Sequence, residues 1–211
     1  MLQALIFFFG IHPSVLSPIT SPISTQFLAE NIAAVQAGHV ATHFYAPGPE
    51  SAFGNFTGSG VTIGCVFWCL MSKNKALKQV GRLSFIPALF GINEPIVFGL
   101  PIVLNPTLLI PFVLVPTVNI VISYFAMAMN LVPICSGINI PWTTPIVISG
   151  FLATNWAGAL LQVLLLILGI FIYMPFIKIM DKQYLEEEIN MQNDEEEEDD
   201  ISLDDLSFDD L

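Results

Sequence analysis

Long apolar segments alternate with short polar ones along the first 180 residues of the chain. The last two, 108–129 and 146–177, are long enough for the ~20 residues with which a helix spans the hydrocarbon core of a membrane. The segments 83–92 and 96–104 are each too short to span it. The apolar segments are 2–11, 61–71, 83–92, 96–104, 108–129 and 146–177.

Polar and proline residues separate the two short segments, in the string GINEPIVFGLPIVLNP. Proline lacks the amide that a helix interior needs, and broken backbone survives at membrane depth only where protein or a water-filled cavity satisfies its free groups. The pattern therefore predicts hairpins that enter the membrane and return. The expected fold class is an all-α, polytopic membrane protein with transmembrane helices and re-entrant helical hairpins.

Composition supports a lipid environment. Hydrophobic residues make up 54% and charged residues 11% of the 211 residues. So few charges cannot cover the surface of a soluble globule of this size. We therefore expect the lipid bilayer to surround most of the chain.

The six cations fall into two clusters, which predict the topology. One cluster lies within 73–82 and the other within 178–182. Under the positive-inside rule both are cytoplasmic, so the chain between them crosses the bilayer an even number of times. We expect segment 108–129 to run outward and segment 146–177 to return. The stretch 83–105 then enters and leaves from the cytoplasmic side.

The acidic residues are concentrated at the C-terminus. The formal net charge is −12, yet all but three of the 18 acidic residues lie at Asp181 or beyond. A segment of this composition cannot bury a core, and its like charges repel. We predict a membrane-embedded body over residues 1–180 and an acidic, disordered cytoplasmic tail over residues 181–211.

Glu94 is the strongest candidate for function, because an acid is rare inside an apolar region. A carboxylate at membrane depth costs ~2.5 to 3.5 kcal/mol on insertion scales, and Pro95 prevents an ordinary helix through it. We interpret Glu94 as a ligand-binding or proton-handling group, with hydrogen-bonded packing as the alternative. Asn93 and Asn105 are neutral donors and acceptors that could share the same cavity.

His12 and Trp142 are weaker candidates when residue type alone is considered. His12 ends the string FFFGIH, and a lone histidine is more often a satisfied core or loop residue. Trp142 lies in PWTTP. A tryptophan is common at a membrane interface, but beside threonine hydroxyls it also suits a sugar, whose apolar ring face stacks while its hydroxyls need polar partners. Both interpretations stay open for each residue.

The sequence offers no catalytic, metal or cofactor site. His39 and His43 are four residues apart but lack the adjacent acid of a zinc-protease helix. The glycine-rich stretch 54–64 lacks the lysine of a P-loop. We expect no catalytic residue, metal or cofactor in this chain, and no nucleic-acid partner.

Three cysteines form neither a metal site nor a disulfide framework, because their number is odd and their spacing fits no ligand set. Cys65 and Cys69 lie one helical turn apart in an apolar run. We interpret them as small packing residues on one helix face. Cys135 is assigned no role.

Several unusual strings occur together and in order: FFFGIH, GSGVTIG, GINEPIVFGLPIVLNP, IPWTTPIVISGFLAT and YMPFIKIMDKQ. In these the chain resembles the lactose/cellobiose family of phosphotransferase-system IIC (EIIC) sugar permeases, over nearly all of residues 1–185. The resemblance implies a homodimeric, multi-pass permease of the bacterial cell membrane. Its implied substrate is a β-linked disaccharide of the cellobiose, lactose or chitobiose type. Its implied partners are the A and B components (EIIA and EIIB) on the cytoplasmic side.

The family's sugar-site residues match positions of this chain one by one. The histidine of its Gly-Ile-His motif matches His12, the glutamate of its Asn-Glu-Pro motif matches Glu94, and its Pro-Trp-Thr-Thr-Pro tryptophan matches Trp142. The resemblance implies that His12 and Glu94 lie near the sugar hydroxyl that is phosphorylated and orient it. The phosphoryl group would come from a phosphocysteine on the separate B component.

The chain departs from the family's pattern in two ways. Pro13 stands where the family usually has glycine, which removes a backbone donor. A complete permease of this family would also carry about as much membrane sequence again before Leu2. We therefore expect the sugar-binding, C-terminal half of a permease: a fragment, a truncated frame or one half of a split protein. The alternatives are an ion-coupled secondary carrier with Glu94 at broken helices, or an inactive remnant.

Overall fold

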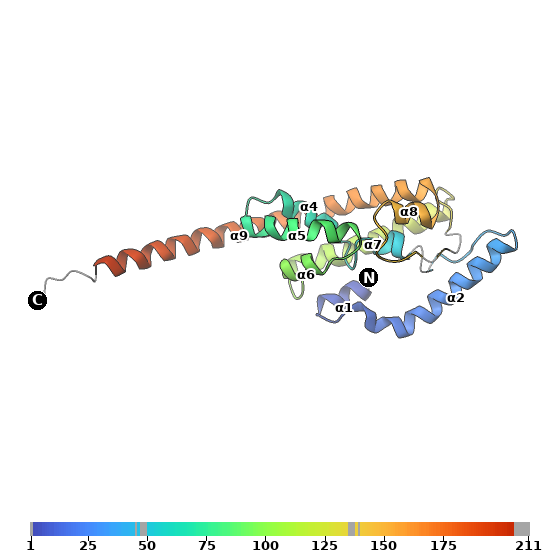
Figure 1. Ribbon diagram of the computed structural model, residues 1–211, viewed down its shortest axis with the longest axis horizontal. Coiled ribbons are helices and arrows are strands. Elements are labelled where there is room, and N and C mark those ends of the chain that lie inside the picture. Colours follow the sequence, from blue (N-terminus) through green and yellow to red (C-terminus); the bar gives the residue numbers. More distant parts are fainter. Residues whose placement is uncertain (1, 45, 47–49, 135–137, 139, 205–211) are drawn as a thin grey trace, which may run out of the picture.

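The computed structural model describes residues 2–44, 46, 50–134, 138 and 140–204. Every named element in those residues is helical, so the expected all-α class is confirmed. Figure 1 shows a bundle of helices with α9 extending far beyond it. The elements are α1 Leu2–Phe8, α2 Ser17–Gln36, α4 Ile63–Met71, α5 Lys75–Leu89, α6 Glu94–Gly99, α7 Pro106–Ala128, α8 Ile148–Ala153 and α9 Trp156–Asp204, with a 3₁₀-helix η1 Pro13–Leu16 and a π-helix η2 Glu50–Gly54.

Two helices, α7 and α9, are long and apolar enough to cross a membrane, among the described residues. Of their most apolar 18-residue stretches, 39% in α7 and 33% in α9 is buried by the rest of the chain. The remaining apolar surface needs lipid or another protein to cover it. These two helices correspond to the two long segments that the apolar pattern predicts.

The start of α7 is set by Asn105 and Pro106. The side-chain oxygen of Asn105 accepts hydrogen bonds from the backbone amides of Thr107 (3.0 Å) and Leu108 (3.4 Å). Pro106 stands at the first helical position, where its missing amide costs nothing. Asn105 is therefore a helix cap, and the expectation that it shares a ligand cavity with Asn93 is wrong.

The predicted segment 146–177 is not one continuous helix, because the chain breaks between α8 and α9. Asn155 marks the restart, since its side-chain oxygen accepts a hydrogen bond from the amide of Ala157 (2.8 Å). The apolar pattern of the sequence continues through this break and does not reveal it. Thr154 and Asn155 are isolated polar residues in a long apolar run, and their effect depends on capping rather than on hydropathy.

One buried side chain, that of Gln162 in α9, satisfies the backbone at the start of α8. Its Oε1 accepts hydrogen bonds from the amides of Val147 (2.6 Å) and Gly150 (3.0 Å). Its Nε2 donates to the carbonyl of Ala52 (2.7 Å) and the hydroxyl of Ser149 (2.8 Å). Unpaired polar groups are costly where water is excluded, so Gln162 is what permits the break.

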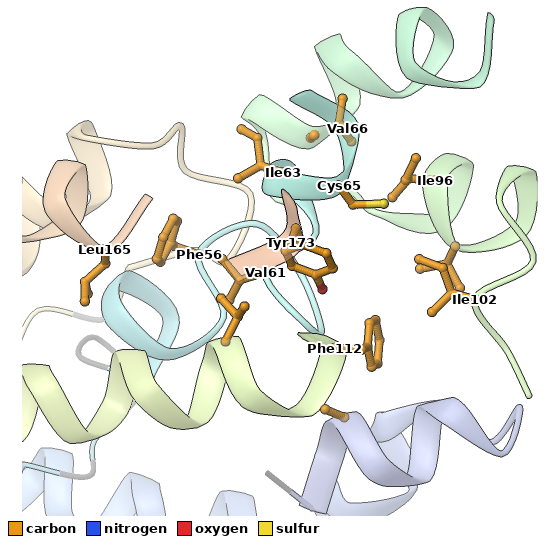
Figure 2. Close-up of a cluster of buried hydrophobic side chains, with 14 of the residues drawn as sticks. Phe56, Val61, Ile63, Cys65, Val66, Ile96, Ile102, Phe112, Leu165 and Tyr173 are labelled. Atoms are coloured by element: carbon orange, nitrogen blue, oxygen red, sulfur yellow. The ribbon is translucent and has the colours of Figure 1, made fainter. Parts of the chain in front are cut away.

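The apolar core lies between α4, α7 and α9. Cys65 and Cys69 are buried free thiols on α4, packed in this core as the sequence predicts, whereas Cys135 lies outside the described residues. A Cβ atom at Gly64 would stand 2.7 Å from the carbonyl oxygen of Gly169, so glycine allows α4 to approach α9 closely. Figure 2 labels the central side chains: Phe56, Val61, Ile63, Cys65, Val66, Ile96, Ile102, Phe112, Leu165 and Tyr173.

Helices α5 and α6 form the short hairpin that the sequence predicts, and they pack against each other. α5 begins well before the predicted segment 83–92, because the side chain of Asn74 caps it by accepting a hydrogen bond from the amide of Leu77 (3.0 Å). A Cβ atom at Gly99 would stand 2.8 Å from Cγ1 of Val80, so α6 lies close against α5. The hairpin places Glu94 at the start of α6.

Helix α9 continues through the acidic segment, so the described part of the predicted tail, 181–204, is helical where disorder was expected. Glutamate, lysine and glutamine are good helix formers, and extending an existing helix avoids the cost of nucleation. The first turns of this extension are tied to the turn before α5. Asp181 accepts a hydrogen bond from the Ser72 hydroxyl, and Glu188 accepts one from the side-chain amide of Asn74 (2.9 Å).

Helix α2 is an element that the apolar pattern does not predict, and Pro22 in its interior discourages a helix. Its C-terminal end is bound to the segment that follows. The side-chain oxygen of Asn31 accepts hydrogen bonds from the amides of Thr42 (3.1 Å) and His43 (2.9 Å), and its nitrogen donates to the His43 carbonyl (2.7 Å). Asn31 is fully buried. This end of α2 is therefore fixed by buried polar contacts.

The side chain of His43 adds to this attachment. Its Nε2 lies 2.5 Å from a carboxylate oxygen of Glu30, and its ring stacks on Phe27 with the centroids 4.4 Å apart. A hydrogen bond from Gln26 lowers the pKa of Glu30, burial opposes this by less, and the hydrogen bond and charge of His43 lower the pKa further. The carboxylate therefore stays ionised and holds the contact at neutral pH.

Candidate functional site

One cavity of ≈570 Å³ brings together residues that lie far apart in the sequence. Its volume falls in the range of ordinary ligand pockets. All four predicted site residues, His12, Asn93, Glu94 and Trp142, line it. The full lining is Gln3, His12, Pro13, Ser14, Ser17, Ser21, Ser24, Thr25, Asn55, Gly58, Ser59, Gly91, Asn93, Glu94 and Trp142.

His12 is held by the turn that leads from α1 into η1. Its Nδ1 accepts a hydrogen bond from the backbone amide of Ser14 (3.2 Å), so the proton of the neutral ring lies on Nε2. The ring packs edge-on against Phe7, with centroids 5.7 Å apart. Pro13 occupies the first position of η1, where a missing amide is tolerated. The departure from glycine at this position is therefore compatible with the turn.

Asn93 is held by a tight glycine turn. It is 5% exposed, and its side-chain nitrogen donates a hydrogen bond to the carbonyl of Ser59 (2.7 Å). Gly58 has φ +81°, and a Cβ atom there would stand 2.6 Å from Cγ of Asn93. The turn is tied to α9, because the buried Tyr173 hydroxyl donates to the carbonyl of Gly60 (2.8 Å). Figure 2 shows Tyr173 within the core cluster.

Glu94 is the first residue of α6, and Pro95 follows it at a position where proline suits a helix start. Its side chain is exposed and lines the cavity. Within the described residues, its carboxylate makes neither an ion pair nor a hydrogen bond. Besides His12 it is the one ionisable side chain in the lining. The carboxylate is therefore available to a ligand rather than engaged in packing.

Trp142 lies in a turn that is closed by a hydrogen bond from the Thr144 amide to the Pro141 carbonyl (3.0 Å). Its carbonyl oxygen is packed so closely on Gly91 that a Cβ atom there would stand only 2.7 Å away. The residue is 62% exposed. An exposed indole at a polar cavity offers an apolar face for stacking.

A family model described as "Phosphotransferase system, EIIC" matches residues 1–116. The chain belongs to this family. The match includes three of the four predicted site residues, His12, Asn93 and Glu94, and confirms the resemblance drawn from the motifs.

Individual EIIC proteins match over most of the chain. The oligo-β-mannoside-specific EIIC component of Bacillus subtilis is 38% identical over 188 residues, which are 87% of this chain and 42% of that protein. The lichenan permease IIC component of the same organism is 37% identical over 187 residues, covering 87% of this chain and 41% of that protein. The lactose-specific EIICB component of Staphylococcus epidermidis is 38% identical over 191 residues, covering 88% of this chain and 32% of that protein.

The fold also matches a solved EIIC structure. The crystal structure of the transporter ChbC, the IIC component from the N,N'-diacetylchitobiose-specific phosphotransferase system, has a TM-score of 0.85 and 40% sequence identity. The match covers 89% of this chain and 44% of that one. The all-α membrane fold is thus confirmed, and the chain spans less than half the length of the EIIC relatives it matches.

Other lining residues of this EIIC cavity were not predicted from the sequence. Asn55 donates a hydrogen bond to the side-chain oxygen of Gln3 (2.9 Å), which links the wall near Gly58 to α1. Ser17, Ser21 and Thr25 lie on α2. Their i, i+4, i+8 spacing is a visible signal of one helix face, but it means little unless α2 is recognised as a helix.

The cavity combines one carboxylate, one imidazole and one exposed indole with neutral hydroxyls and amides. A neutral, polyhydroxylated ligand matches this set, because each hydroxyl both donates and accepts. The imidazole can donate its Nε2 proton to a sugar hydroxyl, and the carboxylate can accept a hydroxyl proton. Among the described residues, no group of three or more histidine, cysteine or acidic side chains could hold a metal ion.

Proposed function

We propose that this chain is the sugar-binding half of an EIIC permease that carries a β-linked disaccharide across the bacterial cell membrane for phosphorylation. The observation that carries the proposal is the meeting of His12, Asn93, Glu94 and Trp142 in one cavity. These residues lie on separate segments of a chain that belongs to the EIIC family. Their convergence gives the motifs a common site, which a chance resemblance would not require.

The class of substrate is supported by the names of the relatives. They are specific for oligo-β-mannoside, lactose and N,N'-diacetylchitobiose, and one is a lichenan permease. These are all sugars with β-linked rings. A β-linked disaccharide is therefore the proposed ligand of the ≈570 Å³ cavity.

The proposed roles follow from the chemistry of the side chains that line the site. Glu94 accepts a hydrogen bond from the sugar hydroxyl that is phosphorylated. The Nε2 proton of His12 fixes the orientation of the sugar ring that carries this hydroxyl. Trp142 stacks on the apolar ring face. Asn93, held by Ser59, offers its side-chain oxygen to a neighbouring hydroxyl. The phosphoryl group itself comes from a phosphocysteine on the B component.

The proposed partners approach from the cytoplasmic side. The cation cluster at 73–82 lies in the turn before α5 and in α5 itself, and the cluster at 178–182 lies on α9 where its acidic extension begins. A hydrogen bond between Ser72 and Asp181 joins these two regions. The positive-inside rule therefore places both regions, and with them the acidic extension, in the cytoplasm. The lactose relative is an EIICB component, and this supports a B partner for this chain. The A component and a homodimeric permease complete the proposed assembly.

Coupling to phosphorylation is tested by measuring uptake of radiolabelled cellobiose in cells that contain this chain. We expect intracellular label to be phosphorylated sugar and to disappear when the A or B component is deleted, because the permease alone has no phosphoryl donor. Accumulation of unmodified sugar driven by a proton gradient would instead support the ion-coupled carrier.

The cytoplasmic position of the first cation cluster has a separate test. A cysteine introduced in place of Lys73 should react with an impermeant thiol reagent only after the cells are permeabilised.

Glu94→Gln tests the site. The variant keeps the shape but removes the charge that strengthens the hydrogen bond to the sugar. Charge-assisted hydrogen bonds contribute ~1.5 to 3 kcal/mol, so affinity should fall by roughly 10- to 100-fold. Equilibrium binding to purified protein and protein level in the membrane are measured together, and the level should be normal.

Glu187→Gln is the matched control, because Glu187 is exposed on the α9 extension and does not line the cavity. It should bind sugar like the wild type. Unchanged affinity in Glu94→Gln, with lowered protein level only in Glu94→Leu, would assign Glu94 to packing. No disaccharide binding by folded wild-type protein would support the inactive-remnant alternative.

A further inference from the structure

A row of free hydroxyls runs along the cavity face of α2. Ser17, Ser21 and Thr25, here called the hydroxyl row, are each four residues apart and all line the cavity. Residues at this spacing share one helix face, and the row extends over about 12 Å at 1.5 Å of rise per residue. The row is thus an elongated polar surface along the cavity.

The hydroxyls of this row are unusual in having no partner among the described residues. Helical serine and threonine commonly donate to the carbonyl four residues earlier. Thr20 does this, donating to the Leu16 carbonyl (3.1 Å). The row residues Ser17, Ser21 and Thr25 are exposed and make no such bond within the described structure. Their hydroxyls are therefore free for water or for a ligand.

The side-chain oxygen of Asn93, a second polar atom at the cavity, also has no partner among the described residues. Asn93 is 95% removed from solvent, with 5% exposed. Its nitrogen is bound to Ser59 (2.7 Å), but no described residue hydrogen-bonds its side-chain oxygen. This oxygen is not sealed from solvent, so it is an open acceptor at the cavity surface, available to a ligand that donates to it.

The row is held in place at both ends of α2. Its N-terminal end follows η1 directly, and η1 is capped by His12. Its C-terminal end is fixed by the bonds of Asn31 to Thr42 and His43. A surface that is already ordered loses less entropy when a ligand binds. The row is therefore ordered locally before a ligand binds.

The cavity lining carries two kinds of chemistry. Around Glu94 and His12 the lining offers ionisable groups, which suit a reacting hydroxyl. The row offers only neutral donors and acceptors, which suit hydroxyls that are recognised but do not react. From this contrast we infer that Ser17, Ser21 and Thr25 bind the second ring of the sugar and so select a disaccharide over a monosaccharide. This inference rests on the proposed function.

The test is a double variant, Ser17→Ala with Ser21→Ala, in purified full-length chain. Alanine favours a helix, so α2 is retained. Cellobiose, lactose and N,N'-diacetylchitobiose are titrated, and the tightest binder is compared with the methyl β-glycoside of its single ring. We expect affinity for the disaccharide to fall by roughly 5- to 100-fold, as for two lost hydrogen bonds, with single-ring affinity unchanged within about twofold.

Thr20→Ala is the matched control, since it removes a hydroxyl from α2 that does not line the cavity. It should change neither affinity. Wild-type disaccharide affinity in the double variant would overturn the inference, as would an equal loss for both ligands. Failure of the proposed function is distinct, because wild-type protein would then bind none of the three disaccharides.

Discussion

Gly58→Ala is expected to lower both stability and sugar affinity. The residue has φ +81°, which costs an L-residue about 1 to 2 kcal/mol, and the new Cβ would stand 2.6 Å from Cγ of Asn93. Relieving such an overlap costs about 1 to 3 kcal/mol more. The sum is roughly 2 to 5 kcal/mol, and Asn93 must move away from Ser59. Thermal unfolding in detergent and disaccharide titration measure the two effects.

Gly38→Ala separates the effect of backbone strain from the effect of the contact with Asn93. Gly38 also has a positive φ, +79°, but nothing lies within 4 Å of the position that its Cβ would take. This variant should lose only about 1 to 2 kcal/mol of stability and keep its sugar affinity. If the two variants behave alike, then the backbone conformation alone matters, and the packing of the turn against Asn93 does not support the site.

Gln162→Leu is expected to be the most damaging single substitution. It would leave the amides of Val147 and Gly150, the carbonyl of Ala52 and the hydroxyl of Ser149 without their buried partner. Each unsatisfied group costs about 1 to 3 kcal/mol, so even partial relaxation should leave a loss of roughly 3 to 6 kcal/mol. The unfolding midpoint of the purified protein and its level in the membrane should both fall.

Two comparisons make this result specific to the hydrogen bonds. Gln183→Leu changes the same residue type on the same helix, but Gln183 is exposed, so stability should hardly change. Gln162→Glu keeps the acceptors but sets a buried carboxylate against the Ala52 carbonyl, so it should not restore stability. A Gln162→Leu protein as stable as Gln183→Leu would show that water replaces the side chain at the break.

Much of the candidate site could be predicted because its residues carry motifs. His12, Glu94 and Trp142 stand in strings that are unusual in composition, and Glu94 is conspicuous in an apolar region. Sequence reasoning could not supply the part of the lining that α2 contributes. Ser17 and Ser21 belong to a helix that contains Pro22, and their meaning depends on tertiary placement that no local pattern records.

The prediction of the fold was best where hydropathy alone sets the bounds of a helix, as for α7. It was worst where a capping side chain sets them. Asn105 and Asn155 each start a helix by accepting a backbone amide, and neither stands out in an apolar profile. The helical course of 181–204 was missed for a related reason. Composition predicts whether a segment can fold alone, but this one extends a helix that is already formed.

Helix α9 holds one wall of the cavity at two points. Gln162 binds the carbonyl of Ala52, and Tyr173 binds the carbonyl of Gly60. Eleven residues separate the two side chains, so at 100° per residue they point within about 20° of each other, about 16 Å apart along the axis. The segment between these carbonyls carries Asn55, which lines the cavity. Displacement of this wall must therefore either carry α9 with it or break two buried hydrogen bonds.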